Sequence, residues 1–345
     1  MSNGCSVTNH VVLLDGTTHS LTTAPLSHIM QLYKALHKIY ERPTDPYRQM
    51  LYYRPGIGAG DGLVAKADAA LALSFERQVV KTLLFIRSFY RSGDYLNMVG
   101  FSRGGAIAQV CVRHIRVLGL PRAVDTERTV FRNVKALIRN GGRSNADFRA
   151  IKGCSDYPDL LVTRMILFDP VASSPTVRHS NMMFRRSDAC QVICCYAADE
   201  RRSIFLPVKF APEALGHDQQ VEEDGVTAPD QIRAEFAVFS GGHSDIGGSA
   251  GQHNGIQLIP LRYAIVNAHK MEPRFLWKRG YPGLFGLDLR QLSLERVPPI
   301  VGRDVDFETA VANDPSLLDL LRGDQMSALA PIKDSHYLKW RVAGL

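Results

Sequence analysis

The sequence predicts an α/β fold in which a mostly parallel sheet carries helices on both faces. Short unbroken apolar runs, which are typical of strands buried on both faces, recur along the chain. Between them lie longer segments in which apolar residues return every three or four positions, as they do in helices that cover a sheet. The chain of 345 residues is expected to form one domain over 1–345, with its core at about 9–272.

Six strands are predicted, each an apolar run that ends in a turn. They lie at residues 11–14, 50–53, 95–99, 165–168, 192–196 and 236–239. Helices are predicted at residues 25–40, within 64–90, and at 106–117, 127–139 and 258–270. Beyond residue 272 Pro, Gly and Arg become more frequent, so residues 273–345 are interpreted as a C-terminal extension that packs on the core.

Residues 120–160 differ from the rest of the core because they are rich in basic side chains. These are Arg122, Arg128, Arg132, Lys135, Arg139, Arg143, Arg149 and Lys152. The position of this segment, between a predicted helix and the next strand, predicts an inserted cap. Its basic face could meet phosphate headgroups, while a solvated helix face is the simpler interpretation.

A reactive serine is predicted where the strand at 95–99 turns into the helix at 106–117. Gly100, Ser102 and Gly104 spell G-x-S-x-G, the nucleophile elbow, in which glycines flank the serine because a side chain there would collide with neighbouring backbone. This turn presents the serine Oγ above the sheet. It also leaves the amide of Arg103 at the positive end of a helix, where negative charge on a reacting oxygen would be stabilised.

A nucleophilic serine needs a histidine to accept its proton and a carboxylate to orient that histidine. His243 is the candidate base, because it follows a predicted strand and lies in a glycine-rich loop. Asp169 and Asp199 follow the first and the second predicted strands after the serine. Asp199 stands beside arginines, where a structural ion pair is the simpler interpretation, so Asp169 is the favoured acid and Asp199 the alternative. The order Ser, Asp, His is that of α/β hydrolases.

The strand at 11–14 ends in Asp15-Gly16-Thr17, at the sheet edge where open α/β folds bind ligands. Gly16 and Thr17 are therefore candidates for the second oxyanion donor, beside Arg103. An Asx-type turn at Asp15 explains the same residues equally well. A second loop, 55–62, has glycine at alternate positions but lacks Gly-Lys-Ser/Thr, so a nucleotide-binding Walker loop is not expected.

Composition argues against several other classes. The six cysteines form no C-x-x-C pair and show no metal-ligand spacing, so we expect reduced, mostly buried thiols, no metal and no cofactor. The formal charge of +7 comes without a block of like charges, and no nucleic-acid partner is expected. Residues 1–15 lack a basic region followed by a long apolar run, which predicts no Sec signal, and no apolar run is long enough for a membrane span.

Six motifs together resemble the α/β-hydrolase family that contains the type VI secretion phospholipase effectors of the first Tle class. They are Leu14-Asp15-Gly16-Thr17, Tyr53-Arg54-Pro55-Gly56-Ile57-Gly58, Gly100-Phe101-Ser102-Arg103-Gly104-Gly105, Phe168-Asp169-Pro170-Val171, Ala198-Asp199-Glu200-Arg201-Arg202 and His243-Ser244-Asp245-Ile246-Gly247-Gly248. The chain departs from the family pattern at Thr18 and His19, which replace an aromatic and an amide residue. It departs again at Pro170, in place of threonine, and at Gly105, in place of alanine.

The resemblance implies a serine esterase with its triad on Ser102, Asp169 and His243. It also implies a phospholipid or other acyl-ester substrate at a membrane surface, with A-type phospholipase activity and an antibacterial role. Synthesis in the bacterial cytoplasm, delivery by a type VI system into a target cell's periplasm, a secretion-apparatus partner and an immunity protein are expected on the same ground. The alternatives are an esterase or thioesterase for soluble substrates and a non-catalytic interaction protein of the same fold.

Overall fold

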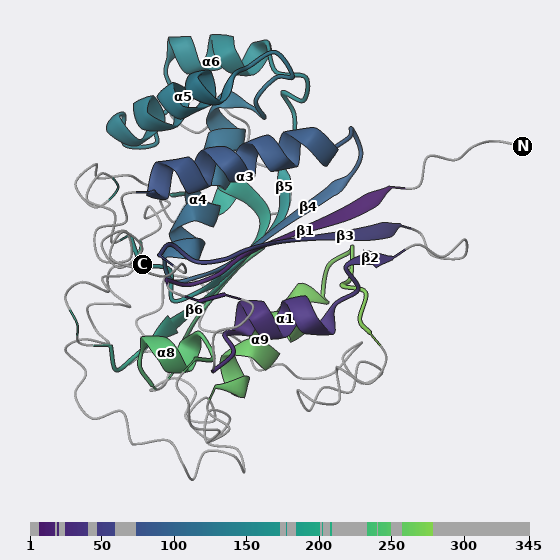
Figure 1. Ribbon diagram of the computed structural model, residues 1–345, viewed down its shortest axis with the longest axis vertical. Coiled ribbons are helices and arrows are strands. Elements are labelled where there is room, and N and C mark those ends of the chain that lie inside the picture. Colours follow the sequence, from purple (N-terminus) through teal and green to yellow (C-terminus); the bar gives the residue numbers. More distant parts are fainter. Residues whose placement is uncertain are drawn as a thin grey trace, which may run out of the picture.

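A seven-stranded sheet forms the centre of the molecule, in the order β2-β3-β1-β4-β5-β6-β7 (Figure 1). The computed structural model describes residues 7–17, 19–20, 25–40, 47–58, 74–172, 177, 184–200, 202, 208, 233–239, 241–249 and 257–278. The strands are β1 (Thr8–Leu14), β2 (Ile39–Tyr40), β3 (Arg48–Arg54), β4 (Tyr95–Phe101), β5 (Val162–Phe168), β6 (Ala189–Ala197) and β7 (Arg233–Phe239). All neighbours are parallel except β2 and β3. The predicted α/β fold class with a mostly parallel sheet is confirmed.

Helices cover both faces of this sheet, as predicted (Figure 1). On one face lie α3 (Phe75–Phe89) and α4 (Arg103–Leu118). On the other lie α1 (His28–Ala35), the single turn α8 (His243–Ile246) and α9 (Leu258–Ala268), and a short 3-10 turn, η1 (Arg186–Asp188), leads into β6. Every residue of α4 is buried, because α4 lies between the sheet and a further layer of helices.

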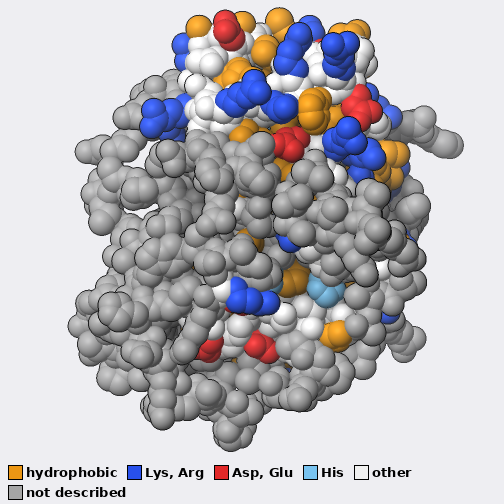
Figure 2. All heavy atoms as spheres, turned by 60° about the vertical axis from the view of Figure 1, so that its left-hand side comes forward, with side chains coloured by type: hydrophobic (Ala, Val, Ile, Leu, Met, Phe, Trp, Pro, Cys, Tyr) orange, Lys and Arg blue, Asp and Glu red, His pale blue; other side chains and the backbone are white. Residues whose placement is uncertain are grey.

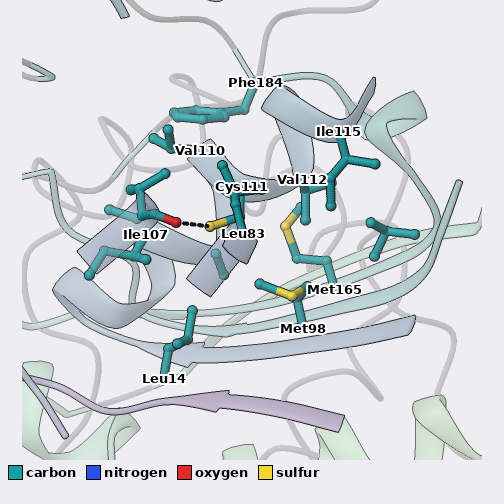
Figure 3. Close-up of a cluster of buried hydrophobic side chains, with 14 of the residues drawn as sticks. Leu14, Leu83, Met98, Ile107, Val110, Cys111, Val112, Ile115, Met165 and Phe184 are labelled. Atoms are coloured by element: carbon teal, nitrogen blue, oxygen red, sulfur yellow. Dashed lines mark hydrogen bonds between the residues drawn. The ribbon is translucent and has the colours of Figure 1, made fainter. Parts of the chain in front are cut away.

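Two apolar clusters hold these layers together. One fills the space between the sheet and α3 with α4, where Leu14, Met98 and Met165 of the strands meet Leu83 and Cys111 of the helices (Figure 3). The other lies beneath α1 and α9 on the opposite face. β1 is buried along its whole length, and its last four residues, Val11 to Leu14, are all apolar because both faces of the sheet are covered.

The segment predicted as a cap is an outer layer of two helices, α5 (Glu127–Arg139) and α6 (Ala146–Gly153), which lie over α3 and α4 (Figure 1). Arg113, in the third turn of α4, donates from Nε to the carbonyl of Gly142 at 2.7 Å, and Ser155 Oγ donates to the Leu120 carbonyl at 2.7 Å. These bonds tie the segment to the end of α4 remote from Ser102. The described residues of the segment therefore lie away from the serine rather than over it.

Residues 271–278, which follow α9, are held by a row of buried polar side chains that crosses the sheet. Arg164 of β5 donates to the carbonyls of Met271 at 2.6 Å and Pro273 at 3.2 Å. It also donates to the side chains of Asn97 at 2.8 Å and Gln191 at 2.7 Å. The predicted extension at 273–345 begins with this fastened segment, and its residues from 279 onward lie outside those described.

Candidate active site

Ser102 stands between β4 and α4 in a backbone conformation that is rare for a residue with a side chain, at φ 56° and ψ −127°. The conformation is held by backbone bonds from the amide of Ser102 to the carbonyl of Phe168, at 3.0 Å, and from the amide of Val171 to the carbonyl of Ser102, also at 3.0 Å. The strand, sharp turn and helix predicted for G-x-S-x-G are present.

The two glycines of the motif make this turn possible. A Cβ at Gly100 would lie 2.6 Å from the Cα of Gly105, and a Cβ at Gly104 would lie 2.3 Å from the carbonyl oxygen of Leu14. Neither atom can move away, because both belong to backbone in the core. Any larger residue would therefore push the first turn of α4 off the end of β1.

Three side chains form a hydrogen-bonded chain at the carboxyl edge of the sheet. His243 Nε2 lies 2.7 Å from Ser102 Oγ, and His243 Nδ1 lies 2.7 Å from Asp169 Oδ2. The other oxygen of Asp169 accepts the amide of Ala197 at 3.0 Å. In the tautomer that directs the Nδ1 proton at the carboxylate, Nε2 carries no proton and can accept the one on Ser102.

The parallel register explains why residues so distant in sequence meet. Phe101, Phe168 and Cys195 are register partners on β4, β5 and β6, so these strands end at one edge. Ser102 and Asp169 are the next residues along the first two strands. Asp169 also has a positive φ, 39°, and its amide donates to the Cys195 carbonyl at 2.7 Å, which turns the carboxylate toward His243.

Asp199, the alternative acid, has a different partner. Its Oδ2 accepts the amide of Gly241 at 2.7 Å, and its own amide donates to the carbonyl of Gly241 at 3.1 Å. Asp245 accepts the amide of Gly242 at 2.8 Å and caps the α8 turn. The two carboxylates thus shape the loop that carries His243, and the one bonded to the imidazole is Asp169.

Glu200 lies in one of the six motifs, but the sequence did not predict a role for it at the site. Its Oε2 accepts the amide of His243 at 3.2 Å, while Arg202 binds both carboxylate oxygens, at 2.8 and 2.6 Å. Burial alone would raise the pKa of Glu200, but the bonds from Arg202 and from the His243 amide hold it below its usual range. The Glu-x-Arg spacing was visible in the sequence, but a local ion pair gives no sign of which backbone it supports.

The ring of Phe101 packs against the imidazole of His243. The ring of Phe101 lies 4.8 Å from that of His243 at 32°, and 5.9 Å from that of His19. A Cβ at Gly247 would lie 2.0 Å from Phe101, and one at Gly16 would lie 2.5 Å from it. The close approach of these two loops to one ring fixes the position of the imidazole.

The Asp15-Gly16-Thr17 turn lies beside the elbow and has the local bond of an Asx-type turn. The amide of Gly16 donates to Asp15 Oδ1 at 2.8 Å, and Tyr53 OH donates to Asp15 Oδ2 at 2.8 Å. Burial raises the pKa of Asp15 and of Tyr53. Because the Gly16 amide is committed to Asp15 in this structure, Arg103 and Thr17 stay the predicted oxyanion donors. Gly56 of the glycine-rich loop supports the turn, since its Cβ would lie 1.6 Å from the Gly16 carbonyl oxygen.

His28, in the first turn of α1, lies inside the fold beside the loop that follows His243. The side chain is fully buried, its ring lies 5.0 Å from that of Phe168, and its amide donates to the carbonyl of Gly247 at 2.8 Å. Burial lowers its pKa to about 3, so the ring is neutral at ordinary pH. His28 thereby braces the loop after His243 from the first turn of α1.

Two further properties concern the described residues as a whole. They contain no cluster of three or more His, Cys, Asp or Glu side chains that could hold a metal ion. No helix among them has both the length and the apolar character needed to cross a bilayer. Of the five cysteines in the described ranges, Cys111, Cys194 and Cys195 are buried and all five are free thiols.

Comparison with known proteins gives a family. Residues 8–267 match the model described as "T6SS, Phospholipase effector Tle1-like, catalytic domain". The uncharacterized protein YEL023C of Saccharomyces cerevisiae is 30% identical over 133 residues, which are 34% of this chain and 19% of that protein. The chain thus spans about a fifth of that relative.

Two solved structures are similar at lower identity. One is the Tle1 effector bound to the VgrG spike from the Type 6 secretion system, at 17% identity and a TM-score of 0.35, covering 70% of this chain and 51% of that one. The other is an uncharacterized protein from Pseudomonas aeruginosa, at 13% identity and a TM-score of 0.45, covering 95% and 57%.

Proposed function

The chain belongs to the family of Tle1-like phospholipase effector catalytic domains of type VI secretion, and on that premise we propose that it is a serine esterase that hydrolyses phospholipid acyl esters. The observation that carries the proposal is the bonded chain from Ser102 through His243 to Asp169. A turn that merely contained a serine would not need an imidazole at hydrogen-bonding distance and a buried carboxylate behind it.

The proposed first half-reaction forms an acyl-enzyme. Ser102 Oγ attacks the ester carbonyl while its proton passes to His243 Nε2, and Asp169 stabilises the imidazolium that results. The negative charge on the carbonyl oxygen is held by backbone amides, for which Arg103 and Thr17 are the candidates. The C–O bond then breaks, and the leaving alcohol of the lysolipid takes the proton from Nε2.

The second half-reaction reverses these roles. A water molecule gives a proton to His243 and attacks the acyl carbonyl, and collapse of the intermediate releases the fatty acid and returns the proton to Ser102 Oγ. Cleavage at an acyl ester is the A-type activity that we propose. We propose also that the type VI apparatus delivers the protein, that it acts at the membrane of a target cell, and that an immunity protein neutralises it.

An active-site probe tests the assignment of the nucleophile. A fluorophosphonate should label the purified protein at Ser102, as located by mass spectrometry, and Ser102→Ala should abolish labelling. Ser92→Ala, at an exposed serine in the turn before β4, is the matched control and should label normally. Absence of labelling in the parent protein, or labelling that persists in Ser102→Ala, would refute the proposed nucleophile.

A further inference from the structure

Four basic residues of α5 form a stripe along one side of the helix. They are Arg128, Arg132, Lys135 and Arg139, spaced by four, three and four positions, which brings them onto the same face. The residues that α5 buries against the layer beneath lie on the opposite face. They are Val130, Val134, Leu137 and Ile138. We call the first set the basic stripe; at 1.5 Å per residue it extends over about 16 Å.

The charges of the basic stripe face outward and are not neutralised within the described part of the chain. Arg128, Arg132 and Arg139 are exposed, and none of the ion pairs found among the described residues includes them. Lys135 Nζ lies 5.5 Å from the ring of Phe131. Arg122, at the start of the same segment, shows the contrast, because its guanidinium lies 3.0 Å from the carboxylate of Asp125.

The carboxyl ends of the strands lie toward one side of the molecule, and α5 and α6 form an outer layer over α3 and α4. In Figure 1 these ends and α8 lie on the left, and Figure 2 brings that side forward. At the top of this face, over α5 and α6, Lys and Arg side chains gather with hydrophobic ones between them and few acidic ones (Figure 2). The stripe belongs to the outer helical layer, which is joined to α4 at the end remote from Ser102.

We propose that the basic stripe docks the protein on an anionic phospholipid surface; this inference rests on the proposed phospholipid substrate. Basic side chains close to an anionic leaflet each add to the binding free energy, and a row of them on one helix face can all reach the same plane. The hydrophobic side chains between the basic ones can enter the headgroup region. Their apolar atoms then leave water, while the charged groups stay beside the lipid phosphates. Docking in this way would hold the protein on the surface that contains its proposed substrate.

Vesicle binding by a catalytically silent protein tests this inference separately from hydrolysis. Full-length Ser102→Ala is sedimented with vesicles of phosphatidylglycerol and phosphatidylethanolamine, and with vesicles of phosphatidylcholine alone. Binding is compared in that background for Arg128→Glu/Arg132→Glu and for the charge-matched control Lys34→Glu/Arg91→Glu, whose two exposed side chains lie outside α5 and α6. Circular dichroism and thermal unfolding confirm that each variant folds.

The expected result is that the parent binds anionic vesicles and not phosphatidylcholine, and that high salt releases it. The stripe variant should bind at least about tenfold more weakly, while the control changes by less than about threefold. Equal loss in both variants would refute the stripe as the docking surface, since only net charge would matter.

Failure of the parent to bind anionic vesicles, with binding to soluble polyglutamate instead, would assign the stripe to an acidic protein partner. Vesicle binding without any lipid hydrolysis by the wild type would uphold this inference and refute the proposed substrate.

Discussion

Asp169 and Asp199 show how finely residue roles are set at the sheet edge. Both follow strands, in β5 and β6, and either strand end can carry the acid of such a triad. The positive φ of Asp169 directs its carboxylate at His243. The carboxylate and the amide of Asp199, in contrast, both bond to the backbone of Gly241. The sequence favoured Asp169 because Asp199 has arginine neighbours; in the structure, Arg202 binds Glu200 instead.

Amide substitution should separate the two aspartates. Asp169→Asn is expected to lower kcat by about 10³-fold to 10⁴-fold, because the amide favours the wrong imidazole tautomer and cannot stabilise the imidazolium. Asp199→Asn keeps an acceptor for the Gly241 amide and should cost about tenfold or less. Steady-state hydrolysis of a short-chain ester measures both. If Asp199→Asn proved the more damaging change, the assignment of the acid would be wrong.

Alanine at Gly104 tests the packing of the elbow. The new Cβ would lie 2.3 Å from the Leu14 carbonyl oxygen, and we expect the free energy of unfolding to fall by about 3 kcal/mol. Gly153→Ala is the matched control, because nothing lies within 4 Å of a Cβ there and the residue is the last of α6. The control should be neutral or gain up to about 1 kcal/mol in urea unfolding. Similar losses in both variants would contradict the steric account.

At the scale of elements, two departures from the family pattern lie against each other. A Cβ at Gly105, where the resemblance leads one to expect alanine, would approach the Cβ of Pro170 to 2.9 Å. Pro170 in turn occupies the place of the expected threonine. The ring of Pro170 is thus accommodated by the lack of a side chain at Gly105 in the first turn of α4, which explains why the two changes leave the elbow intact.

The bounds of α1 and β2 were harder to predict from the sequence. The helical pattern of residues 25–40 continues past Leu36, yet α1 ends at Ala35 and residues 39–40 form β2. Leu36 instead pairs with Trp277 in an isolated antiparallel bridge, and Ile39 pairs with Met50 of β3. Strand pairing with residues so distant in sequence overrides the local helical periodicity, and no local sequence pattern reveals such pairing.

Arg164 is the element-scale feature most open to test, since one side chain of β5 fastens residues 271–278. Arg164→Met keeps the length of the side chain but leaves the carbonyls of Met271 and Pro273 without their donor. We expect a loss of about 3 to 5 kcal/mol in the free energy of unfolding.

The control for that variant is Arg274→Met. Arg274 pairs with Glu272 at 3.2 Å, but both side chains are more than half exposed, so the loss should be below about 1 kcal/mol. Urea titrations of both proteins provide the comparison. A loss at Arg164 no larger than that at Arg274 would show that the buried guanidinium does not fasten the segment.

At the scale of the whole molecule, the sequence predicted the α/β layers, six of the seven strands described and the residues of the bonded chain. Success came where buried parallel strands must be apolar throughout and where their carboxyl ends must gather at one edge. The sequence did not reveal the outward position of α5 and α6, the burial of His28 or the support from Glu200. Each of these depends on which surfaces meet, and the amphipathic pattern of a helix does not specify its partner.

Buried histidines make the stability of the whole molecule depend on pH. Burial lowers the pKa of His28 to about 3, and that of His114 and His269 to about 4, from an ordinary value of 6.5. Below pH 6.5 the unfolded chain binds protons that the folded one excludes, so stability falls as the pH drops. The loss at pH 5 is about 2 kcal/mol for each histidine. The raised pKa values of Asp15 and Glu235 act in the opposite sense.

Urea midpoints between pH 7 and pH 5 should therefore decrease steadily. In His114→Leu one of these histidines is removed, and the fall in the free energy of unfolding between pH 7 and pH 5 should be about 2 kcal/mol smaller. An unchanged pH dependence in this variant would show that His114 does not exclude a proton in the folded state.

Release of fatty acid from mixed phosphatidylglycerol and phosphatidylethanolamine vesicles is the most direct test of the proposed phospholipase activity. The purified wild-type protein should release fatty acid and lysolipid in equal amounts, and Ser102→Ala should reduce the rate by about 10⁶-fold, to the background of the assay. Release that persisted in Ser102→Ala would contradict the catalytic account. An inert wild type that still cleaved short-chain esters through Ser102 would retain the triad and refute the phospholipid substrate.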